Sequence, residues 1–191
     1  MKKIKLNPNA FGFPMPQAIV GTTLNGKPNF MAAAWVTRVN YQPPMIGIGI
    51  NRSHATNASI CKYDCFSLNI PSEDLLKETD YIGLVSGKKV DKSMVFPVFT
   101  GELENAPMIE SCTVTMECRL VETLDLPTNT LFVGEIVNAY SEERYMDGNN
   151  VDLARSHPFL LSMPDNRFWR LGSPIGKAWS DGLQLKETKK G

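Results

Sequence analysis

The sequence is poor in the residues that hold metal ions. It has two histidines, His54 and His157, and four cysteines among 191 residues, which is too few for a histidine-rich metal site. Neither neighbouring cysteine pair has the two-residue gap of a zinc or redox motif. We therefore expect four reduced and mostly buried thiols, and no metal site.

The sequence also lacks an excess of charge and a long apolar run. Twenty basic and twenty acidic residues give a net charge of zero, which argues against a protein that coats nucleic acid. The longest apolar runs, Met31–Val36 and Met45–Ile50, are far shorter than the roughly 18 residues of a membrane span. No apolar stretch of signal-peptide length follows the basic start before Pro8. We expect a cytoplasmic protein that binds neither nucleic acid nor membrane.

What is present is an ordinary globular composition. The chain is 42% hydrophobic and 21% charged, and its length suits one domain of usual size. We expect a single domain over residues 1–185 and a frayed tail over residues 186–191.

Strand patterns fill the first third of the chain. Asn25-Gly26 separates the runs Ala18–Leu24 and Asn29–Val39, and this dipeptide is typical of a type I′ hairpin turn, whose two central residues need positive φ. A third strand is predicted at Met45–Ile50, where isoleucine alternates with glycine. A strand of this kind has isoleucine on one face and bare backbone on the other. Either a ligand approaches the glycine face, or a helix or a barrel bend packs on it.

The rest of the chain predicts two modest helices and more strands. Residues 54–63 read as a helix with Ala55, Ala58 and Ile60 inside, and Ser72 is placed to cap a helix over 73–84. Further strands are predicted at 65–71, 111–123, 130–140, 158–162 and 168–171. Residues 17–51 and 111–140 contain no crossover helix, so the sheet should be mainly antiparallel and closed into a barrel.

Three clusters combine small, hydroxyl or amide residues with nearby positive charge, whereas phosphate-loop, dinucleotide-binding and nucleophile-elbow motifs are missing. Residues 29–37 pair an alanine row with Trp35, which suits either a flat ligand or a buried strand. Residues 51–57 offer backbone N–H groups, Ser53, Thr56 and Arg52 either to a phosphate or to simple helix capping. Residues 86–92 carry three lysines, which form a second phosphate clamp only if folding brings them near residues 51–56.

The order of several short motifs resembles the flavin reductase-like, FMN-binding split-barrel family, in its flavoredoxin branch. The motifs span residues 13 to about 176. They are Phe13-Pro14-Met15-Pro16, Asn29 to Trp35, Pro43-Pro44 before an apolar strand, Ser53-x-x-Thr56, Phe66-x-x-Asn69-Ile70-Pro71, Ser86-Gly87-x-x-x-Asp91-Lys92 and Phe132-x-Gly134-Glu135-Ile136. The resemblance implies a mainly β, antiparallel Greek-key split barrel with a few flanking helices.

The resemblance also implies a homodimer that holds FMN without a covalent bond, near the dimer interface. By this resemblance Asn29, Ala33, Ala34, Trp35 and Thr37 contact the ring and ribityl chain, while Arg52, Ser53, Thr56 and Lys92, with Lys89, hold the phosphate. Many relatives have a histidine where this chain has Asn129, which can donate a hydrogen bond to flavin or substrate but does not titrate near neutral pH. Phe168 or Trp169 is placed to cover the ring.

The resemblance implies an oxidoreductase that passes electrons from NAD(P)H or a small redox protein through bound FMN. The reaction belongs to the flavin, so no catalytic acid or base need appear in the sequence. One alternative is an FMN electron carrier without NAD(P)H turnover. The other is a flavin-free split barrel that acts as a binding module, which the joint presence of Trp35, Thr56, Asp91 and Lys92 disfavours.

Overall fold

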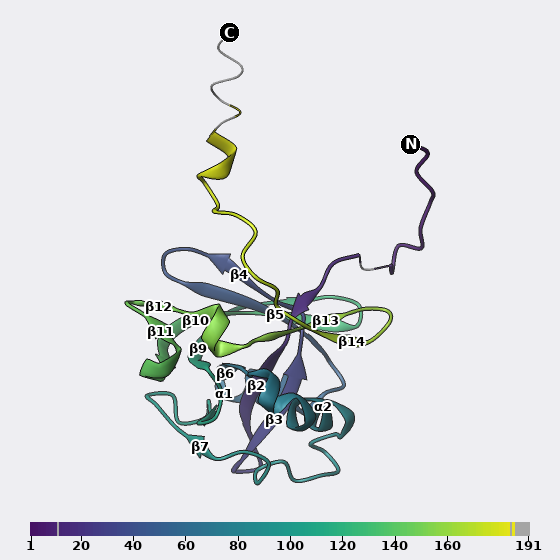
Figure 1. Cartoon of the computed structure of the whole chain (residues 1–191). Coiled ribbons are helices and arrows are strands. Elements are labelled where there is room, and N and C mark those ends of the chain that lie inside the picture. The colour runs from purple at the N-terminus through teal and green to yellow at the C-terminus, as the bar shows by residue number, and fades with distance from the viewer. Residues whose placement is uncertain (11, 184, 186–191) are drawn as a thin grey trace.

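A seven-stranded antiparallel sheet forms the body of the protein (Figure 1). The computed structural model describes residues 1–10, 12–183 and 185. The strand order across the sheet is β3-β2-β6-β9-β10-β5-β4. The strands are β2 (Ala18–Leu24), β3 (Lys27–Ala33), β4 (Val36–Asn40), β5 (Met45–Asn51), β6 (Cys65–Ile70), β9 (Val114–Asp125) and β10 (Asn129–Ser141).

The two outermost strands in this order, β3 and β4, are consecutive in the chain. Only Ala34 and Trp35 lie between them. Seven flat strands would place the outermost two about 29 Å apart, whereas three Cα steps span at most about 11 Å. The sheet must therefore curl until its two sides meet, which confirms the expected mainly β, antiparallel split barrel.

The hairpin predicted at Asn25-Gly26 is confirmed. Both residues have positive φ, 51° and 76°, and β2 pairs with β3 from Ala18–Ala33 to Leu24–Lys27. The single strand predicted over Asn29–Val39 is wrong, because β3 ends at Ala33 and β4 begins at Val36. The two residues between them form the link that closes the barrel. There the Trp35 carbonyl accepts a hydrogen bond from the Gly49 N–H at 2.9 Å.

The core fills the inside of the barrel. Ile46, Ile48 and Ile50 of β5 are buried there with Phe66 and Phe132, as the alternation in β5 predicts. The opposite, glycine face of β5 is covered by the chain itself. A Cβ at Gly47 would lie 2.9 Å from Val39, and one at Gly49 would lie 3.5 Å from the Trp35 ring. The neighbouring strand and the closing link thus approach the bare backbone.

Two helices pack beside the barrel, and each differs in detail from its prediction. Helix α1 (Ala55–Tyr63) buries Ala55 and Ile60, but Ala58 is exposed, so its predicted interior position is wrong. The predicted helix over residues 73–84 is a 3₁₀ turn, η1 (Glu73–Leu75), followed by α2 (Leu76–Leu84). Ser72 precedes the 3₁₀ turn, but its side chain forms no capping hydrogen bond.

A second hydrophobic cluster lies under α2. It contains Ile82 of α2 together with Ile19, Phe30, Phe96 and Ile109. The rings of Phe30 and Phe96 meet edge to face at 5.5 Å. This cluster fixes the end of α2 against β3, where the candidate site lies.

Smaller elements complete the fold. The predicted C-terminal strands are β13 (Phe159–Ser162) and β14 (Arg167–Arg170), which form a three-stranded sheet with β1 (Met15–Pro16). The others are β7 (Val98–Phe99) with β8 (Met108–Ile109), β11 (Met146–Asp147) with β12 (Asn150–Val151), α3 (Leu153–Ser156), and the 3₁₀ turns η2 (Glu143–Tyr145) and η3 (Asp181–Leu183). The segments before β1 and after β14 leave the body on the same side (Figure 1).

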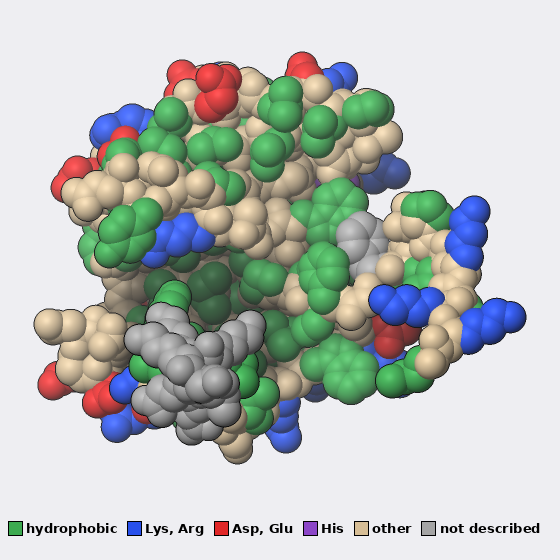
Figure 2. Space-filling view, turned by 90° about the horizontal axis from the view of Figure 1, so that it is seen from above, with side chains coloured by type: hydrophobic (Ala, Val, Ile, Leu, Met, Phe, Trp, Pro, Cys, Tyr) green, Lys and Arg blue, Asp and Glu red, His purple; other side chains and the backbone are tan. Residues whose placement is uncertain are grey.

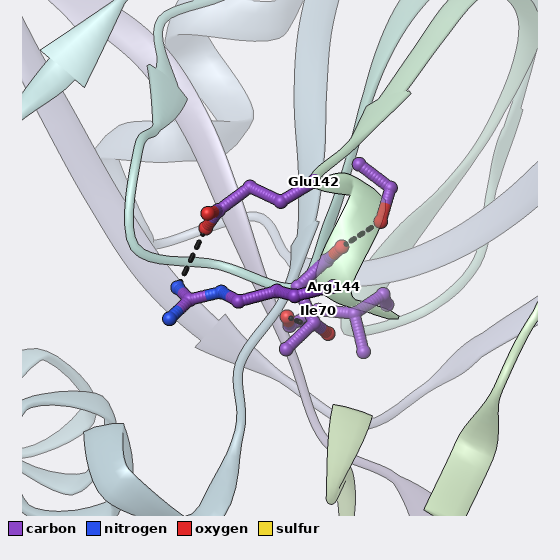
Figure 3. A network of polar contacts seen from close by, with 5 residues as sticks. Ile70, Glu142 and Arg144 are labelled. Atoms are coloured by element: carbon purple, nitrogen blue, oxygen red, sulfur yellow. Dashed lines mark hydrogen bonds and ion pairs between the residues drawn. The ribbon is translucent and has the colours of Figure 1, made fainter. Parts of the chain in front are cut away.

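A polar network fastens the end of β10 to neighbouring chain (Figure 3). The Ser141 hydroxyl donates to the Thr113 carbonyl at 2.7 Å, and the Thr113 hydroxyl donates to the Ile70 carbonyl at 3.1 Å. Beyond the strand, Arg144 donates to Glu142 at 2.7 Å. The network joins β10 to the end of β6.

All four cysteines are free thiols, and Cys65, Cys112 and Cys118 are buried, as expected, whereas Cys61 is exposed. In the described part of the chain, no helix has the length and apolarity needed to cross a membrane. The tail predicted over residues 186–191 lies outside the described residues.

Candidate phosphate-binding pocket

Residues from three distant parts of the sequence line one small pocket. It has a volume of about 220 Å³ and lies between β3, the start of α1 and the loop that follows α2. Asn29, His54, Thr56, Ser86, Gly87 and Lys92 are among its lining residues. We call it the Thr56 pocket. The fold thus brings the lysine cluster of residues 86–92 beside residues 51–56. This proximity is what the interpretation of the lysines as a phosphate clamp requires.

Asn29 connects two walls of the Thr56 pocket. It is buried in β3, and its side-chain amide donates to the Thr56 hydroxyl at 3.3 Å. Gly87 faces it so closely that a Cβ there would lie 2.3 Å from Asn29 Oδ1. The absence of a side chain at position 87 therefore allows the loop to close on β3.

Lys92 is a buried cation in the wall of the pocket. Its side chain is only 4% exposed, and its ammonium donates to the Phe30 carbonyl at 3.0 Å and to the Ile82 carbonyl at 2.7 Å. An ammonium has three N–H groups, so one remains beyond these two bonds. Burial lowers the pKa of Lys92. Lys92 holds β3 to α2 and also supplies positive charge to the pocket.

The N-terminus of α1 adds donors at the same place. The first N–H groups of a helix have no partner within the helix, and His54 at the N-cap provides no side-chain hydrogen bond to them. Ser53 accepts no hydrogen bond from the first turn either; its N–H and hydroxyl both donate to Asn51 Oδ1, at 2.9 and 2.8 Å. The capping alternative for Ser53 is therefore wrong, and the helix end suits an anion.

His54 is a pocket residue that the sequence did not single out. Its Nδ1 lies 3.1 Å from the Met31 sulfur. Burial, and then the charges of Lys92 and Lys88, lower its pKa. The only available signal was its place inside Ser53-x-x-Thr56, directly before the helix.

The predicted phosphate ligands Arg52 and Lys89, and the predicted flavin or substrate contact Asn129, do not line the Thr56 pocket. Arg52 is exposed and forms an ion pair with Asp125 at 3.3 Å. Asn129 begins β10, opposite Asn51. Lys89 lines an adjoining pocket of about 280 Å³ that shares Asn29, Gly87 and Lys92 with the Thr56 pocket. Lys88 connects the loop of residues 86–92 to the segment before α1, since its ammonium donates to the Ser53 carbonyl at 2.8 Å.

Apart from Asn29, the residues predicted to contact the ring and ribityl chain lie at or beside the barrel's closing link. Ala33 is buried at the end of β3, Ala34 is half-buried, and Thr37 is exposed in β4. Trp35 is 47% exposed while its ring covers Gly49. These residues surround the closure but do not line the Thr56 pocket.

Phe168 and Trp169 lie on the small C-terminal sheet, apart from the Thr56 pocket. Phe168 is half-buried and meets Phe159 edge to face at 5.4 Å. The Trp169 indole donates to the Ser162 hydroxyl at 2.6 Å, and its ring is exposed. Both residues line a separate pocket of about 300 Å³. Within one chain, the structure therefore brings together Asn29, Thr56 and Lys92, and places the other predicted residues elsewhere.

Comparisons with known proteins agree with this architecture. Residues 10–158 match the flavin reductase like domain. Flavoredoxin from Methanosarcina acetivorans is 51% identical, with a TM-score of 0.95, and the match covers 97% of this chain and all of that one. Flavoredoxin of Desulfovibrio vulgaris (Miyazaki F) is 29% identical, with a TM-score of 0.87, over 95% of this chain and all of that one.

A curated relative carries an enzyme name. The reductase component of a 4-nitrophenol 4-monooxygenase/4-nitrocatechol 2-monooxygenase from Rhodococcus opacus is 26% identical over 121 residues, which make up 63% of each protein. The family match covers most of the chain and all seven strands of the barrel sheet. The chain belongs to the flavin reductase-like domain family.

Proposed function

We propose that this protein is an FMN-binding oxidoreductase that takes electrons from NAD(P)H or a small redox protein, and that the Thr56 pocket holds the FMN phosphate. The observation that carries the proposal is the convergence of Thr56, Lys92 and the uncapped start of α1 on one pocket. The likeness to two flavoredoxins and to a monooxygenase reductase component supports the redox role. The four free thiols are in keeping with action in the cytoplasm.

The donor set fits a phosphate group. A phosphate monoester carries a charge of about −1.5 to −2 at neutral pH and accepts several hydrogen bonds. The Thr56 hydroxyl, the remaining Lys92 N–H and the first-turn N–H groups of α1 are donors of matching chemistry. Bound FMN supplies hydride and electron transfer at its ring, while this chain supplies binding and orientation.

The Thr56 pocket is too small to hold the whole of FMN. A volume of about 220 Å³ is below the range of about 300–1,000 Å³ that encloses drug-sized ligands. The phosphate and the start of the ribityl chain fit it, and the flat ring needs another surface. We propose that the ring lies toward the closing link, where Ala33, Ala34, Trp35 and Thr37 are found, with Asn129 as a substrate contact.

A second copy of the chain completes the proposed site. Figure 2 views the side from which the terminal segments leave, and it shows hydrophobic side chains gathered around a hollow. β4 lies on this side in Figure 1. Val39 of β4 is exposed, as are Trp35 just before the strand and Tyr41 just after it. Ile175 and Trp179 of the C-terminal segment are also exposed. Large exposed apolar surfaces mark interaction sites, so we propose a homodimer in which Phe168 or Trp169 of one copy covers the ring held by the other.

The binding test compares purified wild-type protein with Thr56→Val and a matched control, Thr115→Val. Thr115 is also a buried threonine, but it lies in β9 away from the pocket. Loss of one hydrogen bond to a charged group should weaken FMN binding by about 1–3 kcal/mol in Thr56→Val alone. Equal FMN affinity in the two variants would reject the phosphate assignment, and failure of the wild type to retain FMN would favour a flavin-free binding module.

The reaction test follows the colour of the FMN-loaded protein under anaerobic conditions. Bleaching by NADH or NADPH indicates a reductase. A flavin that resists both nucleotides but accepts electrons from a small redox protein indicates an electron carrier, the function that the flavoredoxin likeness also supports. Light scattering during size-exclusion chromatography tests the homodimer, and a monomer mass would refute it.

A further inference from the structure

We propose that His54 binds the phosphate with uptake of a proton: it is neutral in the ligand-free protein and becomes a charged donor when a phosphate dianion enters the Thr56 pocket. The inference rests on the proposed function and adds a residue and a pH dependence to it. FMN binding should consequently be tighter at lower pH.

The geometry places the imidazole where it can act. His54 directly precedes α1 and lines the pocket together with Thr56 and Lys92. Its Nδ1 lies 3.1 Å from the sulfur of Met31, on β3. A thioether sulfur only accepts hydrogen bonds, so this contact orients the ring and favours the proton on Nδ1. Nε2 is then the atom that takes up the additional proton.

The charges around His54 keep it neutral in the ligand-free protein. Although His54 is partly exposed, desolvation of its covered side lowers its pKa most, followed by Lys92 and then Lys88, which both come from the loop after α2. Met31, which faces the ring from β3, is uncharged. All three named influences act against a second proton, so at neutral pH the ring is neutral.

A phosphate dianion reverses this balance. It offsets the two ammonium charges and offers an acceptor to Nε2–H, and both effects favour the protonated ring. The pKa of His54 then rises on binding, and the complex holds one more proton than the free protein. Affinity therefore increases as pH falls through the pKa of the complex, by at most about tenfold per pH unit.

The experiment measures dissociation constants of FMN and riboflavin from about pH 6 to about pH 8 for wild type, His54→Gln and His157→Asn. Glutamine keeps an N–H donor but does not titrate. His157, the second histidine of the chain, ends α3 outside the pocket with φ of 43°, a conformation that asparagine tolerates. The protonation of FMN itself is common to all three proteins and cancels in their ratios.

We expect the ratio of the FMN affinity of wild type to that of His54→Gln to fall about three- to tenfold as the pH is raised across this range. His157→Asn should follow wild type, and riboflavin, which has no phosphate, should show no such difference. Equal pH dependence in wild type and His54→Gln, with both binding FMN, would overturn the role of His54. If wild type binds FMN no better than riboflavin at any pH, the phosphate assignment of the proposed function fails instead.

A direct measurement covers the case in which His54→Gln does not fold. The two histidine ring signals of wild type are followed by proton NMR against pH, with and without FMN, and His157→Asn identifies the His54 signal. The His54 pKa should lie below its ordinary value of about 6.5 without ligand and rise when FMN is added. An unchanged pKa in the presence of bound FMN would refute the proposal.

Discussion

Replacing Lys92 by methionine tests whether this buried cation holds the fold together. Methionine retains an apolar stem but removes the ammonium that bonds to the Phe30 and Ile82 carbonyls. Two hydrogen bonds from a charged donor contribute about 3–6 kcal/mol together. The desolvation cost of a 4%-exposed ammonium disappears at the same time, which offsets part of the loss. We expect a net decrease of about 2–4 kcal/mol in the free energy of unfolding.

The assay is urea denaturation followed by circular dichroism, with Lys89→Met as the control. Lys89 lies in the same loop but is exposed, so its replacement should change the free energy of unfolding by less than about 0.5 kcal/mol. Equal losses in the two variants would refute the structural role of Lys92. The FMN affinity of Lys92→Met must be measured where the variant remains folded, because this residue affects both stability and the pocket.

Three more predictions concern Cys118, Glu117 and Gly87. Burial raises the pKa of the Cys118 thiol from 9.0 to about 12. The contribution of this thiol to stability is therefore complete below pH 9 and falls above it, by up to about 1.4 kcal/mol per pH unit. In alkaline urea denaturation, the free energy of unfolding should consequently fall less steeply with pH in Cys118→Ala than in wild type. Glu117 accepts a hydrogen bond from Tyr140 at 2.7 Å, which raises the pKa of Tyr140; an ultraviolet titration of Glu117→Gln should show that pKa lowered toward about 10, and an unchanged value would contradict the contact. Gly87→Ala should lower the thermal midpoint and FMN affinity because its Cβ would displace Asn29; unchanged values would show that the loop adapts.

Local signals in the sequence predicted the parts of the fold that depend on neighbouring residues. Asn25-Gly26 specifies its turn by the backbone angles that it tolerates, and the isoleucine alternation of β5 specifies its buried face. The break at Ala34 and Trp35 depends instead on the meeting of the two sides of the sheet. Ala58 was misplaced because α1 buries polar residues such as Thr56 rather than an apolar stripe.

The sequence predicts some of the residues of the candidate site, but it does not predict how they contact one another. Hydroxyl, amide and cation side chains suggested phosphate at Thr56 and Lys92, but no spacing could show that Asn29 would donate a hydrogen bond to Thr56. Nor could the sequence show that Lys92 is bonded to two carbonyls. His54 was missed because a lone histidine at a helix start has many uses, and only the fold places it beside two lysines.

The two-residue link between β3 and β4 limits how the chain can vary in length. Doubling the length of a flexible loop costs only about 0.6 kcal/mol in closure entropy, so insertions are tolerable in long exposed loops. One residue added at Ala34–Trp35 would reverse the inward and outward alternation of β4 relative to β3. It would also move the Trp35 ring from its cover over Gly49. Insertions and deletions in this protein should therefore be selected against strongly at this two-residue connection, where the barrel closes.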